Sequence, residues 1–236
     1  MNSVLFKDVT KSFSNIKVLD NMNFAIPKGS LTCLLGPSGS GKTTMMKLMI
    51  GADIPTSGKI EINGKQLSHK ELVNIGFMPQ SDSVYLDLSG YDNLLFFGRL
   101  QGMNRVQLRN RILYLGTLLN MESSLERLVS TYSGGMKKRL SLMIALLHNP
   151  SFLILDEPTV GIDPLLRKKI WQEFRNLQSE GKTILISTHV LDEVQYCDRG
   201  ILIREGKIIA DDKMEKLLEI SHNDIEELFL QQEDEK

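Results

Sequence analysis

The stretch Gly36 to Thr44, which reads Gly-Pro-Ser-Gly-Ser-Gly-Lys-Thr-Thr, constrains this chain more than any other segment. It fits G-x-x-x-x-G-K-[ST], the phosphate-binding loop motif. Its glycines let several backbone N–H groups point inward, and the helix expected after it presents the positive end of its dipole, so a polyphosphate would be held by fixed dipoles. Apolar runs at 31–35 and 44–50 predict the strand and helix that this motif needs on either side. They disfavour the alternative of a flexible glycine and serine turn.

Individual roles within the loop follow from the chemistry of a nucleoside triphosphate. The amine of Lys42 is expected to reach the β- and γ-phosphates, and the hydroxyl of Thr43 to bind Mg²⁺. Thr44 is a further candidate for a phosphate contact. The remaining candidate nucleotide-binding residues of the loop are Gly36, Pro37, Ser38, Gly39, Ser40 and Gly41.

Length and charge limit what surrounds this loop. With 236 residues the chain can form one large domain, or one domain with an inserted lobe. A formal net charge of -1 gives no global basic field that would argue for a nucleic-acid partner. No run of about eighteen apolar residues and no signal pattern occurs, so we expect a chain that does not cross a membrane.

The two cysteines predict neither a metal site nor a disulfide. Cys33 and Cys197 are far apart in the sequence and neither belongs to a Cys-x-x-Cys pair. The default expectation for such a chain is a reducing cytoplasm.

The first part of the chain predicts an antiparallel sheet. Short alternating pieces occur at 4–6, 17–19 and 22–26, and a turn follows at 27–29. The segment 59–65 predicts a hairpin that turns at Asn63-Gly64. Phe13 has two interpretations, an ordinary core aromatic or a ring on which a purine stacks.

Residues from about 85 to 150 predict helices without strands. One helix should begin at Asn104, with Gln107 as its capping-box partner, and bury a face formed by Leu108, Ile112, Leu115 and Leu119. A second apolar cluster comprises Leu94, Leu95, Phe97 and Leu100. We interpret both sets as core packing in preference to a partner-binding surface. These helices predict a lobe inserted between two halves of an α/β domain.

The segment Tyr132-Ser133-Gly134-Gly135-Met136 predicts a second anion-binding helix start. Ser133 can cap the helix, and the glycines Gly134 and Gly135 leave its first N–H groups unobstructed. No other explanation accounts as well for paired glycines at a helix start.

Polar residues follow three buried strands. The run 152–158 predicts a buried strand that ends in Asp156 and Glu157, and adjacent acids at the carboxyl end of a strand suit one Mg²⁺ contact and one water-activating base. His189 follows the strand 183–188, where a polar group beside a phosphate site favours a γ-phosphate contact. Gln80 follows the strand 75–78, and by pattern alone it is an ordinary loop residue. Asp163-Pro164 predicts the start of a helix.

Taken together and in this order, the motifs resemble those of the ATP-binding cassette (ABC) ATPases over nearly the whole chain. The resemblance implies an α/β fold: a RecA-like P-loop NTPase core with an N-terminal antiparallel β subdomain and an inserted helical subdomain. Residues 1–84 and 151–236 would form the core with the β subdomain, and 85–150 the helical subdomain, of a single ABC ATPase domain spanning 1–236.

The resemblance also implies roles for individual residues. Phe13 matches the adenine-stacking aromatic, with Val18 near it, and Gly36 to Thr44 match Walker A. Gln80 matches the Q-loop glutamine that touches Mg²⁺ and lies close to the transporter partner. The other matches are Ser133, Gly134 and Gly135 for the signature motif, Asp156 for the end of Walker B, Glu157 for the catalytic carboxylate, Asp163 for the D-loop and His189 for the switch histidine.

The family's mechanism implies ATP with Mg²⁺ and a head-to-tail pair of cassettes. Ser133 and Gly135 of one copy would touch the γ-phosphate that the loop of the other holds, in a homodimer or a heterodimer. Tyr132 and Met136 replace the commoner Leu and Gln of the signature, and together with Val160 to Pro164 and the tail 224–230 they resemble the ABC-2 group of exporters. A separate membrane permease is then the expected partner, with the chain on the cytoplasmic face of the membrane.

Two other functions are weighed against this interpretation. A soluble ABC protein acting on DNA or ribosomes would carry tandem cassettes or long coiled-coil insertions, and the sequence has neither a second phosphate loop nor a sustained heptad run. A P-loop kinase or nucleotide-binding regulator would not explain Ser133 to Gly135 or His189.

Overall fold

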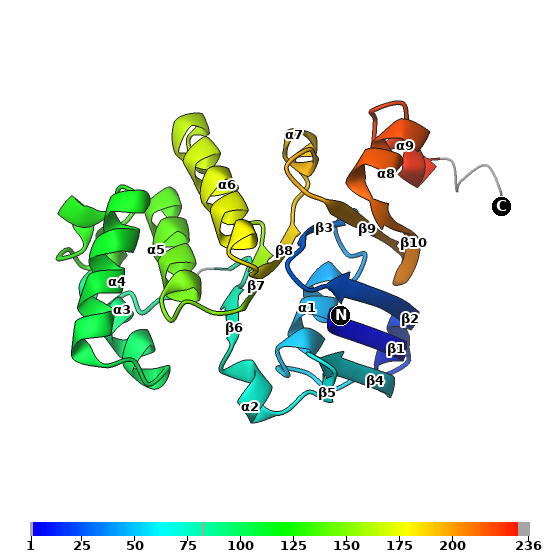
Figure 1. The fold of residues 1–236 in the computed structure, drawn as a ribbon. Coiled ribbons are helices and arrows are strands. Elements are labelled where there is room, and N and C mark those ends of the chain that lie inside the picture. The colour runs from blue at the N-terminus through cyan, green and yellow to red at the C-terminus, as the bar shows by residue number, and fades with distance from the viewer. Residues whose placement is uncertain (1, 82, 231–236) are drawn as a thin grey trace.

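The computed structural model describes residues 2–81 and 83–230, which form two sheets flanked by helices (Figure 1). The larger sheet has six strands in the order β10-β9-β3-β8-β7-β6. These are β10 (Lys207–Lys213), β9 (Arg199–Arg204), β3 (Leu31–Leu35), β8 (Thr183–Ser187), β7 (Phe152–Asp156) and β6 (Ile75–Met78). Only β10 runs antiparallel to its neighbour, so the carboxyl ends of the other five strands share one edge.

The strands at the centre of this sheet are buried along their whole length because both faces are covered. Every residue of β3, β7 and β8 is buried, as expected for parallel strands packed on both sides. Alternate residues face two separate cores. Leu153 and Leu155 of β7 belong to the core on the side of the helical group, while Phe152 and Ile154 pack toward the smaller sheet.

The smaller sheet is antiparallel, with the strand order β2-β1-β4-β5. Its strands are β1 (Asn2–Phe13), β2 (Ile16–Pro27), β4 (Ser57–Ile62) and β5 (Lys65–Gln66). The antiparallel arrangement was predicted, but the short separate pieces were wrong. The register shifts within the pairing of β1 and β2 indicate bulges in two continuous twelve-residue strands. These bulges interrupt the alternation of buried and exposed residues, so the sequence pattern shows only the pieces between them.

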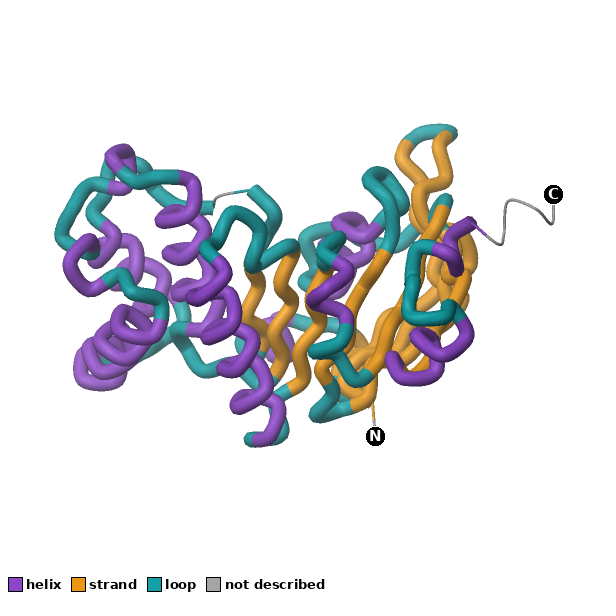
Figure 2. The backbone as a smooth tube through the Cα atoms, turned by 90° about the horizontal axis from the view of Figure 1, so that it is seen from above, coloured by secondary structure: helices purple, strands orange, loops and turns teal. Residues whose placement is uncertain are grey.

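Three helices stand together at one end of the molecule (Figure 2): α3 (Gly90–Leu100), α4 (Arg105–Leu118) and α5 (Gly134–Leu146). Asn104 caps α4 in a capping box with Gln107, as predicted. The face of α4 formed by Leu108, Ile112, Leu115 and Leu119 is buried. The second cluster is only partly core, because Leu94 is fully buried whereas Leu100 is 68% exposed. Gly102, at φ 73°, turns the chain directly after α3, which leaves Leu100 at the tip of the α3–α4 hairpin.

The remaining helices surround the large sheet or follow it. α1 (Lys42–Met49) follows β3, α2 (His69–Leu72) precedes β6, and α6 (Pro164–Ser179) lies between β7 and β8 in the chain. α7 (Leu191–Val194) follows β8, and α8 (Met214–Ile220) and α9 (Glu227–Leu230) complete the described chain. Asp163 caps α6 and Pro164 is its first residue, as predicted. Within residues 2–81 and 83–230, no helix combines the length and apolar character needed to span a bilayer.

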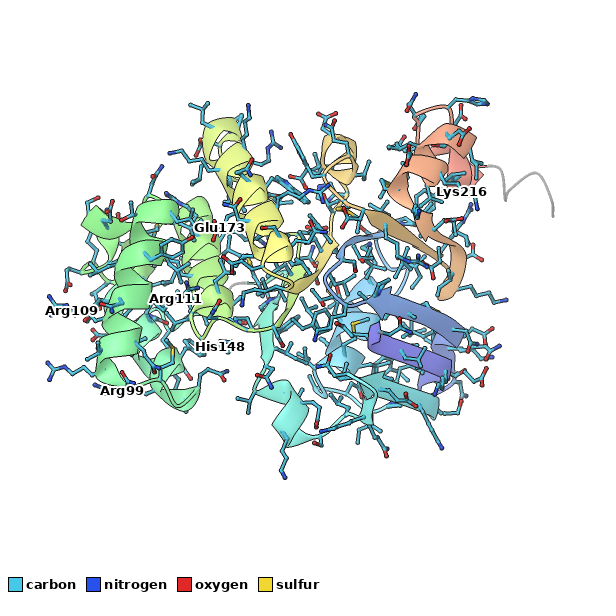
Figure 3. All side chains as sticks on the ribbon, viewed as in Figure 1. Arg99, Arg109, Arg111, His148, Glu173 and Lys216 are labelled. Carbon is cyan, nitrogen blue, oxygen red and sulfur yellow. A yellow bond between two sulfur atoms is a disulfide. The ribbon has the colours of Figure 1, made fainter. Side chains whose placement is uncertain are left out.

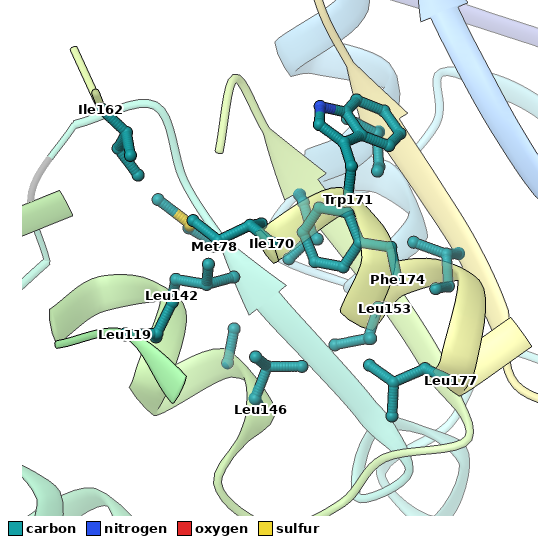
Figure 4. Close-up of a cluster of buried hydrophobic side chains, with 14 of the residues drawn as sticks. Met78, Leu119, Leu142, Leu146, Leu153, Ile162, Ile170, Trp171, Phe174 and Leu177 are labelled. Carbon is teal, nitrogen blue, oxygen red and sulfur yellow. The ribbon is translucent and has the colours of Figure 1, made fainter. Parts of the chain in front are cut away.

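The core beneath α6 joins the large sheet to the helical group (Figure 4). Trp171 and Phe174 of α6 are buried and meet edge to face, with ring centroids 5.6 Å apart. Leu142 and Leu146 of α5 lie in the same cluster. The helical group therefore shares a continuous hydrophobic core with the sheet.

The cysteine prediction was wrong, because the structure joins Cys33 and Cys197 in a disulfide with a Cα–Cα distance of 6.0 Å. Their sequence separation of 164 residues concealed their proximity. The backbone N–H of Asp198 donates to the carbonyl of Leu31, and the Asp198 carboxylate accepts from the N–H of Leu31. These bonds hold the segment after α7 against β3, which places the two sulfur atoms side by side.

Candidate functional site

The glycine-rich loop connects β3 to α1 at the carboxyl edge of the large sheet. Gly36 allows the closest approach, because a Cβ atom there would lie 2.2 Å from the carbonyl oxygen of Ile203 in β9. Gly41 precedes α1 with a φ of 107°, and a Cβ there would lie 2.6 Å from Leu19. The loop can adopt this course only with glycine at both positions. α1 has no side-chain cap, so its first N–H groups face the loop.

Lys42 bends back over the loop. Its Nζ donates to the carbonyl oxygens of Gly36 at 2.6 Å and Pro37 at 2.9 Å. Partial burial lowers the pKa of this amine, and the neighbouring carboxylates Asp156 and Glu157 oppose part of that effect. The arrangement places a concentrated positive charge where the loop's N–H groups converge.

Asp156 lies at the end of β7 and is fixed by two hydroxyl groups. Thr43 Oγ1 donates to its Oδ2 at 3.0 Å, and Ser187 Oγ, from the neighbouring β8, donates to its Oδ1. The carboxylate is 2% exposed, so its orientation is set by these partners. The phosphate loop and the buried strand thus meet at one carboxylate.

Glu157 has a left-handed backbone with φ 52°, which is uncommon for a residue other than glycine, asparagine or aspartate. The backbone N–H of Glu157 donates to Ser187 Oγ at 3.0 Å. Its carboxylate contacts two side chains from separate loops. Gln80 Nε2 donates to Oε2 at 3.2 Å, and His189 Nδ1 lies 3.0 Å from Oε1. Three polar groups that follow three different strands therefore converge on one point.

These residues border a cleft of about 280 Å³. Its lining residues are Val18, Ser38, Gly39, Gly41, Lys42, Thr43, Thr44, Gln80, Asp156 and Glu157. Of the two residues expected near an adenine ring, Val18 lines the cleft and Phe13 does not. Phe13 is 47% exposed at the end of β1, with Lys11 Nζ 4.6 Å from the centre of its ring.

The second glycine-rich segment begins α5 and lies outside this cleft. Ser133 is the N-cap, and its Oγ accepts from the N–H of Met136 at 3.3 Å, as predicted. Ser133 and Gly134 are exposed. A Cβ on Gly135 would lie 3.1 Å from the carbonyl oxygen of Gly161, so this helix start adjoins the segment that leads to Asp163. Within one chain, Ser133, Gly134 and Gly135 are not brought to the phosphate loop.

Two polar residues that the sequence analysis did not select connect these parts. Lys138 of α5 is 9% exposed, and its Nζ donates to the backbone carbonyl of Gln80 at 3.0 Å. This bond ties the helix that begins at Ser133 to the loop that carries Gln80. Ser187 binds both Asp156 and Glu157. Nothing in the pattern of a buried strand distinguishes such a serine from a core residue.

Glu193 of α7 was also missed. Its carboxylate is 2% exposed and accepts from Thr159 at 2.7 Å and from Thr188 at 2.6 Å. Thr159 lies two residues after Glu157, and Thr188 directly precedes His189. One buried carboxylate therefore joins the two loops that carry Glu157 and His189. Nothing in the sequence around Glu193 signalled this role, because Thr159 lies 34 residues away in the chain.

Comparison with known proteins agrees with this geometry. The family model described as ABC transporter matches residues 19–160. Among curated proteins, ABC transporter G family member 20 of Dictyostelium discoideum is 38% identical over 232 residues, which is 97% of this chain. Nod factor export ATP-binding protein I of Paraburkholderia xenovorans is 39% identical over 89% of this chain. The chain spans 32% of the Dictyostelium protein and 70% of the Paraburkholderia protein.

A solved structure shows the same fold. The dimeric, post-hydrolysis structure of an ATP-binding cassette bound to ADP and Pi superposes with a TM-score of 0.81 at 29% identity, covering 89% of this chain and 98% of that one. The fold prediction, a P-loop NTPase core with an antiparallel sheet and an inserted helical part, is confirmed. The limits of the subdomains, 1–84 with 151–236 and 85–150, remain a prediction.

Proposed function

The chain belongs to the ABC transporter family as an ATP-binding cassette with ATPase activity, and from this premise we propose that it is the motor subunit of an ABC-2 type exporter. The observation that carries the motor function is the distribution of the site over two places on one chain. The cleft gathers the phosphate loop with Asp156, Glu157, Gln80 and His189, while the exposed Ser133 lies outside it. Two copies are required to bring both sets to one phosphate.

The proposed mechanism is a head-to-tail pair of cassettes that closes on ATP. The loop of one copy holds the phosphates by its N–H groups and Lys42, and the α5 helix start of the other contacts the γ-phosphate through Ser133 and Gly135. Glu157 orients and deprotonates the attacking water. His189 and Gln80, each within hydrogen-bond distance of a Glu157 oxygen, hold that carboxylate in place. Hydrolysis removes the shared phosphate, and the pair opens.

The residues present fit a magnesium ion bound with the nucleotide. Thr43 Oγ1 and Asp156 Oδ2 are oxygen atoms that can ligate a metal, and they lie 3.0 Å apart beside the phosphate loop. In nucleotide sites Mg²⁺ binds few protein oxygens, and phosphate and water supply its other ligands. The proposed ligands are Thr43, Asp156 and Gln80, directly or through water. The ion would neutralise phosphate charge during transfer.

The proposed partners are a second cassette, identical or not, and a separate transmembrane permease, with the chain on the cytoplasmic face of the membrane. The relative named for Nod factor export supports the direction of transport. The relatives reported above are named for transport or export, so a soluble protein acting on DNA or ribosomes receives no support. We expect no nucleic-acid partner.

Sedimentation of the Glu157→Gln variant tests the pairing. This substitution keeps the shape of the side chain but removes the base, so ATP with Mg²⁺ should hold the variant as a stable dimer. Wild-type protein, which hydrolyses ATP, should return to monomer as ADP accumulates. A Glu157→Gln variant that remains strictly monomeric at high concentration in saturating ATP and Mg²⁺ would contradict the proposal. Co-purification of the wild-type chain with a membrane permease tests the exporter assignment separately.

A further inference from the structure

Beyond Asp92 in the first turn of α3, the α3–α4 hairpin is free of acidic residues. From Asn93 to Met121 the sequence contains no aspartate or glutamate, and it contains the arginines Arg99, Arg105, Arg109 and Arg111. Arg111 is used inside the fold, because its guanidinium donates to the carbonyls of Leu146 and Leu147 at the end of α5. The other three are exposed. In the described part of the chain, none of the three guanidinium groups has an ion pair or a side-chain hydrogen bond.

These three arginines lie on one outer surface. Arg105 and Arg109 are four residues apart on α4, so they share a face of the helix. Figure 3 shows Arg99 and Arg109 at the outer edge of the helical group, on the side away from the sheets. The adjoining face of α4 is already buried by Leu108 and Ile112. The charges therefore point outward because the inner face of the helix is fully used.

Apolar side chains are interleaved with these charges. Leu100 is 68% exposed, Val106 69% and Leu113 59%. Leu113 lies four residues after Arg109, so it extends the row formed by Arg105 and Arg109 along α4. It also borders a hollow of about 440 Å³, together with Tyr114, Thr117 and Leu118. A helix that is apolar on its outer face as well as its inner face is expected to contact something besides water.

We propose that the arginine face, defined as Arg99, Leu100, Arg105, Val106, Arg109 and Leu113, binds directly to an anionic phospholipid bilayer. Guanidinium groups pair with lipid phosphates, and the aliphatic side chains enter the boundary between headgroups and acyl chains. Because Arg99, Arg105 and Arg109 have no ion pair with a described residue and the segment 93–121 that carries them contains no carboxylate, the face is complementary to a negative surface. The exposed apolar side chains of the face are aliphatic, which favours lipid as the occupant.

This contact goes beyond the proposed motor function, because it places the cassette against lipid without a permease. The tip of a helical hairpin can reach a flat surface while the nucleotide cleft, formed by loops of the large sheet, stays open. The face would orient the cassette on the bilayer before or during its contact with a membrane subunit.

Vesicle sedimentation of the full chain tests the proposal. The wild-type chain should pellet with vesicles of phosphatidylcholine and phosphatidylglycerol but not with phosphatidylcholine alone, and added salt should release it. At about 1 kcal/mol per basic residue near such a surface, the triple variant Arg99→Gln, Arg105→Gln, Arg109→Gln should bind on the order of a hundredfold more weakly. The double variant Val106→Ser, Leu113→Ser should bind more weakly at every salt concentration.

A matched control removes three charges from another surface. Lys59, Lys65 and Lys70 are exposed near the smaller sheet and α2, and their triple change to Gln should leave vesicle binding unchanged. ATP hydrolysis in solution by the arginine variant should equal that of wild type, which shows that it is folded and that the motor is intact. Equal loss of binding in both triple variants would overturn the proposal. A wild-type chain that does not bind anionic vesicles would also overturn the proposal. The occupant of the face would then be an acidic protein, and the proposed motor function would not be affected.

Discussion

Two helices of this protein begin at glycine-rich segments, and their surroundings differ. α1 begins at Gly41 inside a cleft, where Lys42, Thr43 and Asp156 converge within the same chain. α5 begins at Ser133 on the exposed surface, outside the cleft and with no carboxylate in its first turn. A helix start offers similar N–H groups in both places. The difference supports the proposal that the first holds a phosphate by itself, whereas the second completes a site formed by another copy.

The largest expected effect comes from Lys42→Ala, which removes the cation from the α1 site. A charged hydrogen bond contributes about 1.5–3 kcal/mol, so affinity for ATP should fall by on the order of a hundredfold. Lys47→Ala, on the exposed side of the same helix, is the matched control and should bind normally. Calorimetric titration with ATP and Mg²⁺ measures both. Equal ATP affinities for Lys42→Ala and Lys47→Ala would contradict the claim that the start of α1 holds the phosphates through Lys42.

Ser133→Arg tests the second helix start. ATP binding to the isolated chain should stay near that of wild type, while hydrolysis should fall by on the order of a hundredfold, the effect of losing a transition-state donor. Mixing this variant with Lys42→Ala should raise hydrolysis well above the sum of the two alone, because each mixed pair contains one site with both Lys42 and Ser133. A mixture with no recovered activity would argue that the site is not shared between copies.

Glu193→Ala tests how the loops that border the nucleotide cleft are positioned. Glu193→Ala frees Thr159 and Thr188, so the loops that carry Glu157 and His189 should lose their mutual positioning. The expected result is a fall in kcat of about tenfold with a KM for ATP within about twofold of wild type, together with about 1–3 kcal/mol of lost stability. Steady-state kinetics measure the first two quantities. Glu193→Gln, which keeps one acceptor oxygen, should recover part of the rate, and no such recovery would indicate a merely structural role.

The smallest effect concerns Tyr114, which lies apart from both helix starts. Its hydroxyl donates to Glu173 at 2.6 Å, and partial burial, with that carboxylate, raises the pKa of Tyr114 to about 12. A raised pKa stabilises the fold below pH 10, and this contribution is lost as the pH rises from about 10 through about 12. Tyr114→Phe should cost about 1 kcal/mol at neutral pH and should weaken the alkaline loss of stability.

Denaturation of wild type and Tyr114→Phe at several pH values measures that difference. ATP affinity and hydrolysis should be the same for the two proteins at neutral pH. Parallel stability curves between pH 10 and 12 would be inconsistent with the Tyr114–Glu173 contact. The half-exposed ring limits the size of the effect, because solvent screens the charge.

The sequence by itself determined the parts that depend on local geometry. A phosphate loop must have glycine where backbone approaches backbone, so Gly36 and Gly41 could be identified from spacing alone. Capping residues such as Ser133, Asp163 and Asn104 act on N–H groups two or three residues away, and their helix starts could be predicted for the same reason. Polar residues directly after buried strands, such as Glu157 and His189, follow from parallel strands sharing one carboxyl edge.

Only the tertiary structure decided which distant residues meet. Cys33 and Cys197, or Glu193 with Thr159, are brought together by strand order and by a loop seated against β3, and neither leaves a periodic trace in the sequence. Lys138 reaches Gln80 through the packing of α5 beside β6, and Leu100 is exposed because a turn ends its helix at the edge of the fold. Local rules concern bonds between near neighbours in the chain. Burial and long-range contacts depend on how whole helices and strands pack, and this packing is determined by many residues spread along the chain.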